Sequence, residues 1–456
     1  MATSQSIPET EIADPNFINE AGDVITELLV LTTAGGIKYD LSNFCQGLTL
    51  FEDIFSNVLT GNALISDSAN IISTLAFQGN EFLTISYRTP SFTEKITKSF
   101  YVSKVSDRTF ISGDRQQAYL ISFISIEGLK DNNIVVSKKY SDTSENIIKK
   151  VFTEYLSGRR LLEQSDTTTL TTTYAASSSH ATLVVPSWNP LKIINWLANR
   201  SFSTAGGAPL YMFFESNKGF YFASIEQLVK SQVDSNKIFA EYVYTPSAAM
   251  ITSPDSGFKY QKPELAKQYG IVKNIKPFKT LDVLEGQDFG YYASRLFTQD
   301  IVLKQYLDIP QNYHTKHQAF SHLEKNKGQL FGRELGTTPD NMRFLRTKHY
   351  KVHADAQDPL FEKWALERNS MLYELSSLRI HIEVPGRTDI EIGKVVNFLY
   401  PKSSDKPEGV VDERDALDPY LSGLYIITAI RHEFSLNRHI MFLELVKDSY
   451  SKPLAR

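Results

Sequence analysis

Both ends of the chain alternate apolar and polar residues with a period of two. Residues 24–30 place Val, Thr, Leu and Val on one parity, and residues 378–384 place Leu, Ile, Ile and Val on one parity with Arg, His and Glu between them. This alternation is typical of half-buried β-strands. Further strand-like runs occur at Asn57–Ser66, Phe82–Arg88, Ile96–Val105, Ala118–Ile126, Val395–Tyr400, Leu424–Ile430 and Ile440–Leu445. Short strands separated by Gly, Pro and Asn favour an antiparallel barrel or sandwich.

Two of these strand regions are alike although they lie far apart in the chain. Tyr101–Phe110 and Tyr425–Phe434 each begin with Tyr before a β-branched residue, end on Phe, and precede an Arg and another apolar strand. Each follows a strand that starts near a glycine and ends at a proline, Gly79–Pro90 and Gly393–Pro401. Any two β-hairpins can share a Tyr and a Phe, but the longer match predicts a duplicated β unit.

The middle of the chain has helical patterns. Ser141–Glu145 supplies an N-cap and an acidic first turn before an apolar stripe from Ile147 to Leu156, and Pro190 opens a second helix. We read Phe51–Phe55 as one helical turn and residues 165–180 as a surface loop. Residues 235–370 are irregular, with weak strands and a helix predicted near residues 359–375.

A hairpin is predicted at residues 210–222. It carries aromatic side chains on both parities, at Phe213, Phe214, Phe220 and Tyr221. We therefore expect one face to be buried and the other to be covered, either by another element of the chain or by a second subunit.

Composition limits the class of protein. A length of 456 residues predicts about three domains, and the Tyr and Phe residues, 51 together against six Met, favour β structure. The net charge is −4 without a basic run, so nothing predicts tight binding of nucleic acid. The N-terminus has no visible secretory signal, and no apolar run is long enough to predict a membrane-spanning helix. Cys45 is the single cysteine, which excludes an internal disulfide and fits a reducing cytoplasm.

Candidate chemistry is sparse. The chain has neither a Gly-rich phosphate loop nor a Gly-x-Ser-x-Gly elbow, and Cys45 is best explained as a small buried apolar residue. His314, His317 and His322 lie close in loop-like sequence, where solvated surface histidines are the simpler interpretation. His349 and His353 are spaced for a shared metal on a helix, but no acidic partner stands where a zincin motif needs one. We therefore predict no catalytic, cofactor or metal site, and no enzyme.

Several segments resemble the central baseplate hub protein of contractile-tailed (myovirus-type) bacteriophages. They are Phe51–Ser56, Leu59–Asp67, Gln78–Ser86, Ser187–Leu191, the Phe213–Phe222 hairpin and the closing strands at 378–447. The stretch from Glu52 to Gly61 and the hairpin are the more specific parts, and residues 235–370 match poorly. The resemblance implies two tail-tube-like barrels per chain and a homotrimer, whose pseudo-sixfold ring connects the sixfold tail tube to a threefold spike.

The resemblance also implies partners and a location. It implies a virion baseplate protein assembled in the bacterial cytoplasm and bound to a tail tube or tube initiator, with baseplate wedge and tape-measure proteins as further contacts. DNA would pass through the lumen without specific binding. The chain ends soon after its last strand, so we expect the trimeric spike to be a separate polypeptide.

The resulting expectation is a mainly β protein with helical accessory segments (α+β), containing two tail-tube-like antiparallel β-barrels and intermediate domains. The expected parts are an arm (1–22), a first barrel (23–130), a helical domain (131–208), a hairpin of the second barrel (209–234), an inserted accessory domain (235–370), the second barrel (371–450) and a tail (451–456). The alternatives are another ring component of a tail or injection machine, such as a distal-tail or tube-terminating protein, and a cell-wall hydrolase. No Asp/Glu pair singles itself out for the hydrolase.

Overall fold

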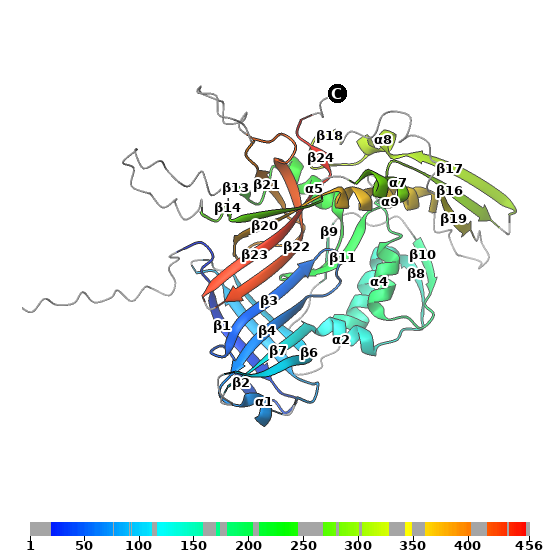
Figure 1. Ribbon diagram of the computed structural model, residues 1–456. Helices are drawn as coiled ribbons and strands as arrows, with labels where there is room; N and C mark the ends of the chain where they lie inside the picture. The colour runs from blue at the N-terminus through cyan, green and yellow to red at the C-terminus, as the bar shows by residue number, and fades with distance from the viewer. Residues whose placement is uncertain are drawn as a thin grey trace, which may run out of the picture.

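The structure is a computed structural model, and it describes most of the chain. The described residues are 20–75, 77–90, 92, 94–111, 116–157, 170–173, 180–203, 209–244, 268–279, 282–300, 303–327, 343–348, 361–402, 417–435 and 437–452. The fold is mainly β with helical segments to one side (Figure 1), as the sequence predicted. No helix within the described ranges is long and apolar enough to cross a membrane.

One large mixed sheet of 14 strands forms the body of the molecule. From the first half of the chain it takes β1 (Ile25–Thr32), β2 (Lys38–Asp40), β3 (Cys45–Asp53), β4 (Thr60–Asp67), β5 (Phe82–Arg88), β6 (Lys95–Ile111) and β7 (Gln116–Ser125). From the second half it takes β13 (Glu241–Tyr244), β14 (Ile271–Val272), β15 (Asn274–Lys279), β20 (Leu378–Pro385), β21 (Val395–Leu399), β22 (Gly423–Ser435) and β23 (Arg438–Lys447).

The expectation of two separate antiparallel barrels needs correction. The described strands of the body form one branched sheet rather than two closed barrels. β22 pairs with β21 and β23 of its own half and also with β3, which joins the two halves. The sheet is also mixed, because β13 runs parallel to both β14 and β21. Separate barrels were expected because alternation along a strand indicates which face is buried but not which strand lies alongside.

The two halves of the sheet nevertheless repeat one strand order. The first half reads β3-β4-β7-β6-β5-β1-β2 and the second reads β15-β20-β23-β22-β21-β13-β14. Matched strands also occur in the same order along the chain. Their directions agree except in the pair β1 and β13, because β1 runs antiparallel to β5 whereas β13 runs parallel to β21, the counterpart of β5. We call the two halves unit 1 and unit 2.

Strand register refines the repeat that the sequence indicated. In unit 1, Phe123 of β7 faces Val102, and a β-bulge follows Val102 in β6. In unit 2, Leu445 of β23 faces Ile427, and a β-bulge follows Ile427 in β22. Matching Phe123 to Leu445 therefore aligns β7 with β23 without a gap. Tyr425 then matches Phe100, one residue before Tyr101. The buried side chains agree, since Phe100 and Tyr425 are 1% and 0% exposed.

The aromatic residues at the ends of the two repeats do correspond. Phe110 faces Gln117 and Phe434 faces His439, which are matched positions in β7 and β23. β6 has a second bulge between Ser106 and Thr109, and this extra residue restores the alignment. A bulge changes the register without leaving a signature in the apolar pattern.

Three clusters of buried apolar side chains lie within the described residues. One fills unit 2, one fills unit 1, and the third fills the helical segment between them. This segment consists of α2 (Ile126–Asn133), β8 (Lys139–Thr143), α3 (Ser144–Val151), a π-helical turn (Phe152–Ser157), β9 (Leu170–Thr173), β10 (His180–Val184) and α4 (Pro190–Ala198). Side chains from β8, α3, the π-helical turn, β10 and α4 make up most of the third cluster. The predicted stripe from Ile147 to Leu156 is buried as expected, with Thr143 accepting a capping bond from the Asn146 amide.

The hairpin β11 (Tyr211–Ser216) and β12 (Gly219–Ser224) lies between two of these cores. It was expected to join the second barrel, but it pairs with β9 in a separate three-stranded sheet. Phe213 and Phe220 pack into the helical core, while Phe214 packs into the core of unit 2. The cover on both faces is therefore supplied by the same chain, and not by a second subunit.

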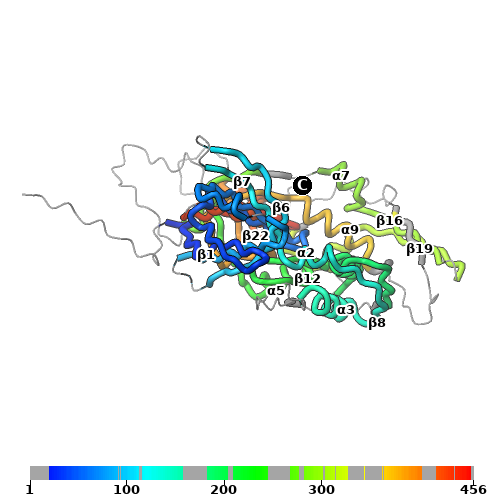
Figure 2. The backbone as a smooth tube through the Cα atoms, turned by 90° about the horizontal axis from the view of Figure 1, so that it is seen from below, coloured from blue at the N-terminus to red at the C-terminus, as the bar shows by residue number. Residues whose placement is uncertain are grey.

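The described strands of residues 235–370 belong mainly to two different β-sheets. Its first part supplies β13, β14 and β15 to the large sheet and is not an insertion. β16 (Ala293–Asp300), β17 (Gln305–Asn312) and β19 (Arg343–Lys348) form a small sheet that projects from the body (Figures 1 and 2). The remaining elements are α1 (Ile71–Thr74), α5 (Ile225–Asp234), α7 (Val283–Asp288), α8 (Tyr313–Lys316), a 3-10 turn (His317–Ala319), β18 (Asn326–Lys327), α9 (Phe361–Ser377) and β24 (Ser449–Tyr450).

Candidate functional site

The junction between the two units is a continuous strand pairing. Residues Ala429–Phe434 of β22 run antiparallel to Leu48–Asp53 of β3. The sequence prediction of a helical turn at Phe51 was wrong, because this segment is the end of β3 and its backbone is paired on both sides. Phe434 of unit 2 reaches into the core of unit 1, so the two units share side chains as well as backbone bonds.

A buried polar network lies behind this junction. Glu52 of β3 accepts a hydrogen bond from Nε2 of His432 on β22 at 2.8 Å, and its other oxygen accepts the backbone N–H of Asn217 at 3.2 Å. The side-chain amide of Asn217 also bonds to Glu52. Glu52 and His432 are each 1% exposed. The network therefore ties unit 1, unit 2 and the turn of the hairpin to one carboxylate.

The hydrogen bonds determine how the two histidines carry their protons. Because Glu52 accepts from Nε2 of His432, Nδ1 of a neutral His432 is the acceptor for Nε2 of His439, 3.0 Å away. Nδ1 of His439 is buried and has no partner among the described residues. Burial, with a smaller contribution from His432, lowers the pKa of His439 well below its ordinary value. His439 is therefore neutral at physiological pH.

A second buried carboxylate attaches the hairpin to unit 1. Glu215 of β11 is 2% exposed and accepts the backbone N–H of Leu59 at 2.9 Å and the hydroxyl of Ser125 at 2.5 Å. Lys98 of β6 donates to it at 2.6 Å. Each donor comes from unit 1, so this group fixes the hairpin against the sheet by directional bonds and not by apolar packing alone.

A groove of about 480 Å³ opens on the solvent face of the sheet at the junction. Its lining includes Asp53, Glu383 and Glu444 together with Lys276 and Arg431. Burial, together with the charge of Glu444, raises the pKa of Asp53 above its ordinary value, although the hydrogen bond from the Phe55 amide lowers it. The groove carries charges of both signs, so its field is not the uniform positive one that tight phosphate binding requires.

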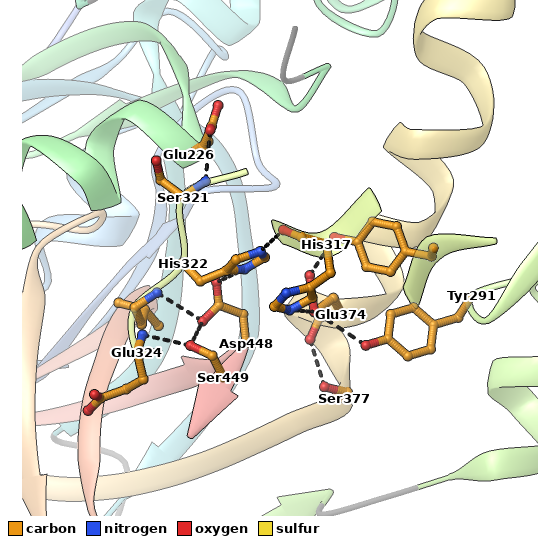
Figure 3. Close-up of polar contacts among 12 residues, drawn as sticks. Glu226, Tyr291, His317, Ser321, His322, Glu324, Glu374, Ser377, Asp448 and Ser449 are labelled. Carbon is orange, nitrogen blue, oxygen red and sulfur yellow. Dashed lines mark hydrogen bonds and ion pairs between the residues drawn. The ribbon is translucent and has the colours of Figure 1, made fainter. Parts of the chain in front are cut away.

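The predicted histidine cluster is placed between α9 and the end of the chain (Figure 3). His317 is 4% exposed, and the side chain of His322 is 8% exposed. The expectation of solvated surface histidines was therefore wrong for both. Nε2 of His317 lies 3.1 Å from Glu374 of α9, and Nδ1 of His322 lies 3.1 Å from Asp448. The side chain of His314, and His349 and His353 altogether, lie outside the described residues.

Two tyrosines complete the surroundings of Glu374. Tyr291 donates to one of its oxygens at 3.2 Å and Tyr313 donates to the other at 2.7 Å. Figure 3 shows Tyr291 and His317 beside this carboxylate, and His322 beside Asp448. The acidic partners could not be predicted from the sequence, because Glu374 and Asp448 are far from the two histidines along the chain.

His317, His322 and Glu374 have the residue types of a metal site, but the ring geometry does not favour one. The two imidazole rings are stacked, with centroids 3.6 Å apart and planes 7° apart, so their lone pairs run parallel and do not converge on one ion. Both nitrogens of His322 face acceptors, Asp448 and, at 2.8 Å, the backbone carbonyl of His317. The ring must donate from both nitrogens, so it is an imidazolium.

The charged form of His322 makes stability dependent on pH. Burial alone would lower its pKa, but Asp448, followed by Glu374, outweighs burial and raises the pKa to about 9 from 6.5. The folded state holds the proton more tightly than the unfolded state, so the stabilisation is complete below pH 6.5 and is lost as pH rises through 9. We expect His322→Gln to lower the free energy of unfolding by roughly 3 kcal/mol at pH 6 and by little at pH 10.

Urea unfolding of both proteins across that pH range measures this difference. Lys316→Ala removes an exposed ion pair with Glu367 from the same segment and serves as the control, with the wild-type pH profile expected. A difference between wild type and His322→Gln that stays constant from pH 6 to pH 10 would contradict the imidazolium assignment.

Cys45 behaves as the sequence predicted. It lies on β3 half-buried, and burial raises the pKa of its thiol to about 11, so little reactive thiolate is present at neutral pH. No catalytic constellation was predicted from sequence. In the buried networks described above, each carboxylate already accepts two or more hydrogen bonds from the chain.

Comparison with known proteins identifies the fold. No protein-family model matches the sequence, and no curated protein matches it. Among solved structures, the chain has the fold of phage tail proteins. A 43 kDa tail protein of prophage MuSo2 from Shewanella oneidensis is 10% identical, with a TM-score of 0.51 over 93% of this chain and 99% of that one. A tail protein from Neisseria meningitidis MC58 is 9% identical, with a TM-score of 0.50 over 92% and 96%.

Proposed function

We propose that this protein is the structural hub of a phage baseplate, a homotrimer whose six β units form a ring between the tail tube and the central spike. The observation that carries the proposal is the repeated seven-strand order within one chain. A chain with two equivalent units gives a trimer six equivalent positions. Such a ring presents sixfold order to a tube and threefold order to a spike.

The similarity in fold to two phage tail proteins supports the assignment to a tail. Short links also support a tube-like shape for each unit. In unit 1 an isolated bridge between Asp23 and Arg438 brings the start of β1 next to the start of β23. In unit 2 only Lys273 separates β14 from β15, so a nearly continuous segment connects β13 with β20. We propose that both units are flattened barrels that share β22 and β23.

The proposed ring encloses the channel for DNA. A net charge of −4 and the mixed charges of the junction groove suit a wall that lets a polyanion pass without holding it. The proposed partners are the tail tube or its initiator and a separate trimeric spike, with wedge and tape-measure proteins as further contacts. The proposed role is structural and non-enzymatic, in keeping with buried carboxylates that accept hydrogen bonds from the chain itself.

The mass of the purified protein tests the proposal. We expect sedimentation velocity at micromolar concentration to give a species of about 155 kDa, three times the 51.6 kDa of the chain. Averaged electron micrographs should show a ring with six similar lobes and threefold symmetry. A stable monomer would contradict the hub. A hexamer of twelve units would instead favour the alternative, a distal-tail or tube-terminating ring.

A further inference from the structure

Besides the terminal strands β14 and β2, two strands in the large sheet, β6 and β15, have an edge with no neighbour among the described strands. β6 is covered by β5 only over Lys95–Tyr101, so its second half, Ser103–Ile111, pairs with β7 on one side alone. β15 pairs with β20 on one side alone. An open edge exposes a row of backbone donors and acceptors that another strand can satisfy.

These edges are the counterparts of the two strands that meet at the junction within the chain. β22 is covered by β21 over its first half and by β3 over its second half. β6 occupies the position of β22 in unit 1, and β15 occupies the position of β3 in unit 2. The chain therefore makes one of its two equivalent unit-to-unit pairings and leaves the other unmade.

We propose that the second half of β6 pairs antiparallel with β15 of a second copy of this chain, repeating between copies the β22–β3 junction. The inference rests on the proposed trimeric ring and specifies how it closes. A heterologous contact of this kind forms a closed ring when the rotation between units is the same at both junctions. Three copies with two junctions each give six such pairings.

The junction within the chain sets the register of the pairing between copies. There Phe434 faces Leu48 and Glu433 faces Thr49. Phe110 and Thr109 are the matched positions in β6. In unit 1, Leu48 and Thr49 face Ala63 and Asn62 of β4, whose counterparts in β20 are Ile382 and His381. Ile275 and Lys276 of β15 face these two residues, so they are the matched positions of Leu48 and Thr49. Phe110 is therefore expected opposite Ile275, and Thr109 opposite Lys276.

Burial at the two sites agrees with this register. Phe434 and Leu48 are each 5% exposed at the junction that is formed. Their counterparts are less covered, with Phe110 62% exposed and Ile275 only half-buried. An exposed Phe beside an open strand edge is costly in water and is the side chain that a docking strand would cover. A small ligand does not satisfy a ladder of backbone groups, so a strand is the occupant that fits.

Cysteine cross-linking tests the register directly. The variant Thr109→Cys with Lys276→Cys, in a Cys45→Ala background, should form covalent trimers on oxidation of the full chain, whereas either single cysteine should not. Asn274→Cys with Thr109→Cys is the matched control, because residue 274 lies on the same face two positions away and should cross-link at least tenfold less. Cross-linked species larger than trimers would overturn the closed ring.

A second variant separates this inference from the proposed function. Phe110→Asp should weaken trimer formation at least tenfold without changing the thermal unfolding of the monomer, since its side chain is exposed in the single chain. Ile37→Ala, which alters another exposed apolar residue at 58% exposure, should leave the trimer intact. The inference would be overturned if Phe110→Asp still formed the trimer and the protein with Thr109→Cys and Lys276→Cys formed no cross-link. The proposed hub function would not be affected by that result. A wild-type monomer would overturn both.

Discussion

Replacing Glu52 by alanine is expected to lower the free energy of unfolding by at least about 3 kcal/mol, because several buried donors lose their acceptor at once. The carboxylate accepts from Nε2 of His432 and from both the backbone and side chain of Asn217. It is 1% exposed, so water does not replace it without opening the junction between the units. Urea unfolding followed by circular dichroism measures the loss.

A matched substitution separates burial from charge. Glu433 lies on the adjoining strand, pairs with Arg431 at 2.9 Å and has a side chain 41% exposed. Glu433→Ala removes the same chemical group from a solvated ion pair, for which a change of about 1 kcal/mol or less is expected. Glu52→Gln retains an acceptor oxygen and should fall between the two. If Glu52→Ala and Glu433→Ala cost the same, the network does not hold the junction.

Substituting alanine for Gly61 is the second change with a large expected effect. Gly61 lies on β4, between β3 and β7, where an added Cβ would stand 2.4 Å from the ring of Phe123 and 2.5 Å from the carbonyl oxygen of Thr49. The ring belongs to the core of unit 1 and the oxygen to a paired strand, so neither moves freely. Overpacking of this kind costs about 3 kcal/mol or more when backbone must shift.

The control is another glycine of the same unit. At Gly35 an added Cβ would meet only the Thr33 hydroxyl, at 3.9 Å. Gly35→Ala is expected to leave the free energy of unfolding within about 1 kcal/mol of wild type, with a slight gain from the stiffer unfolded chain. Thermal unfolding of the two variants compares them. A wild-type melting temperature for Gly61→Ala would show that the contact between β3, β4 and β7 is looser than described.

The sequence predicted strands and helices well where the pattern of neighbouring side chains decides them. Alternation located most strands of the two units, and the helical stripe from Ile147 to Leu156 is buried as predicted. The repeat of Tyr101–Phe110 in Tyr425–Phe434 pointed to two units with one strand order. One error was local: residues 51–53 are the end of β3 and not a helical turn, since pairing of Phe51 with β22 and β4 overrides the turn-like composition.

The candidate sites were less accessible to sequence. The spacing of His317 and His322 showed that they were neighbours, but their partners Glu374 and Asp448 come from α9 and the end of the chain. Nothing in the sequence joined Glu52 to His432, which are 380 residues apart. Burial of a polar side chain depends on what packs over it, and that is a property of the folded chain.

By itself the sequence determined the β character, the buried parity of residues 378–384 and the presence of two similar units, because each follows from the order of side chains along the backbone. The parity predicted for residues 24–30 was wrong, because a bulge between Thr26 and Leu28 shifts the strand and leaves Leu28 exposed while Leu29 is buried. Only the tertiary structure decided that β22 pairs with β3, that a bulge shifts one half of the repeat by a residue, and that β6 and β15 keep open edges. Strand neighbours and bulges depend on contacts between distant segments, which the local pattern does not encode.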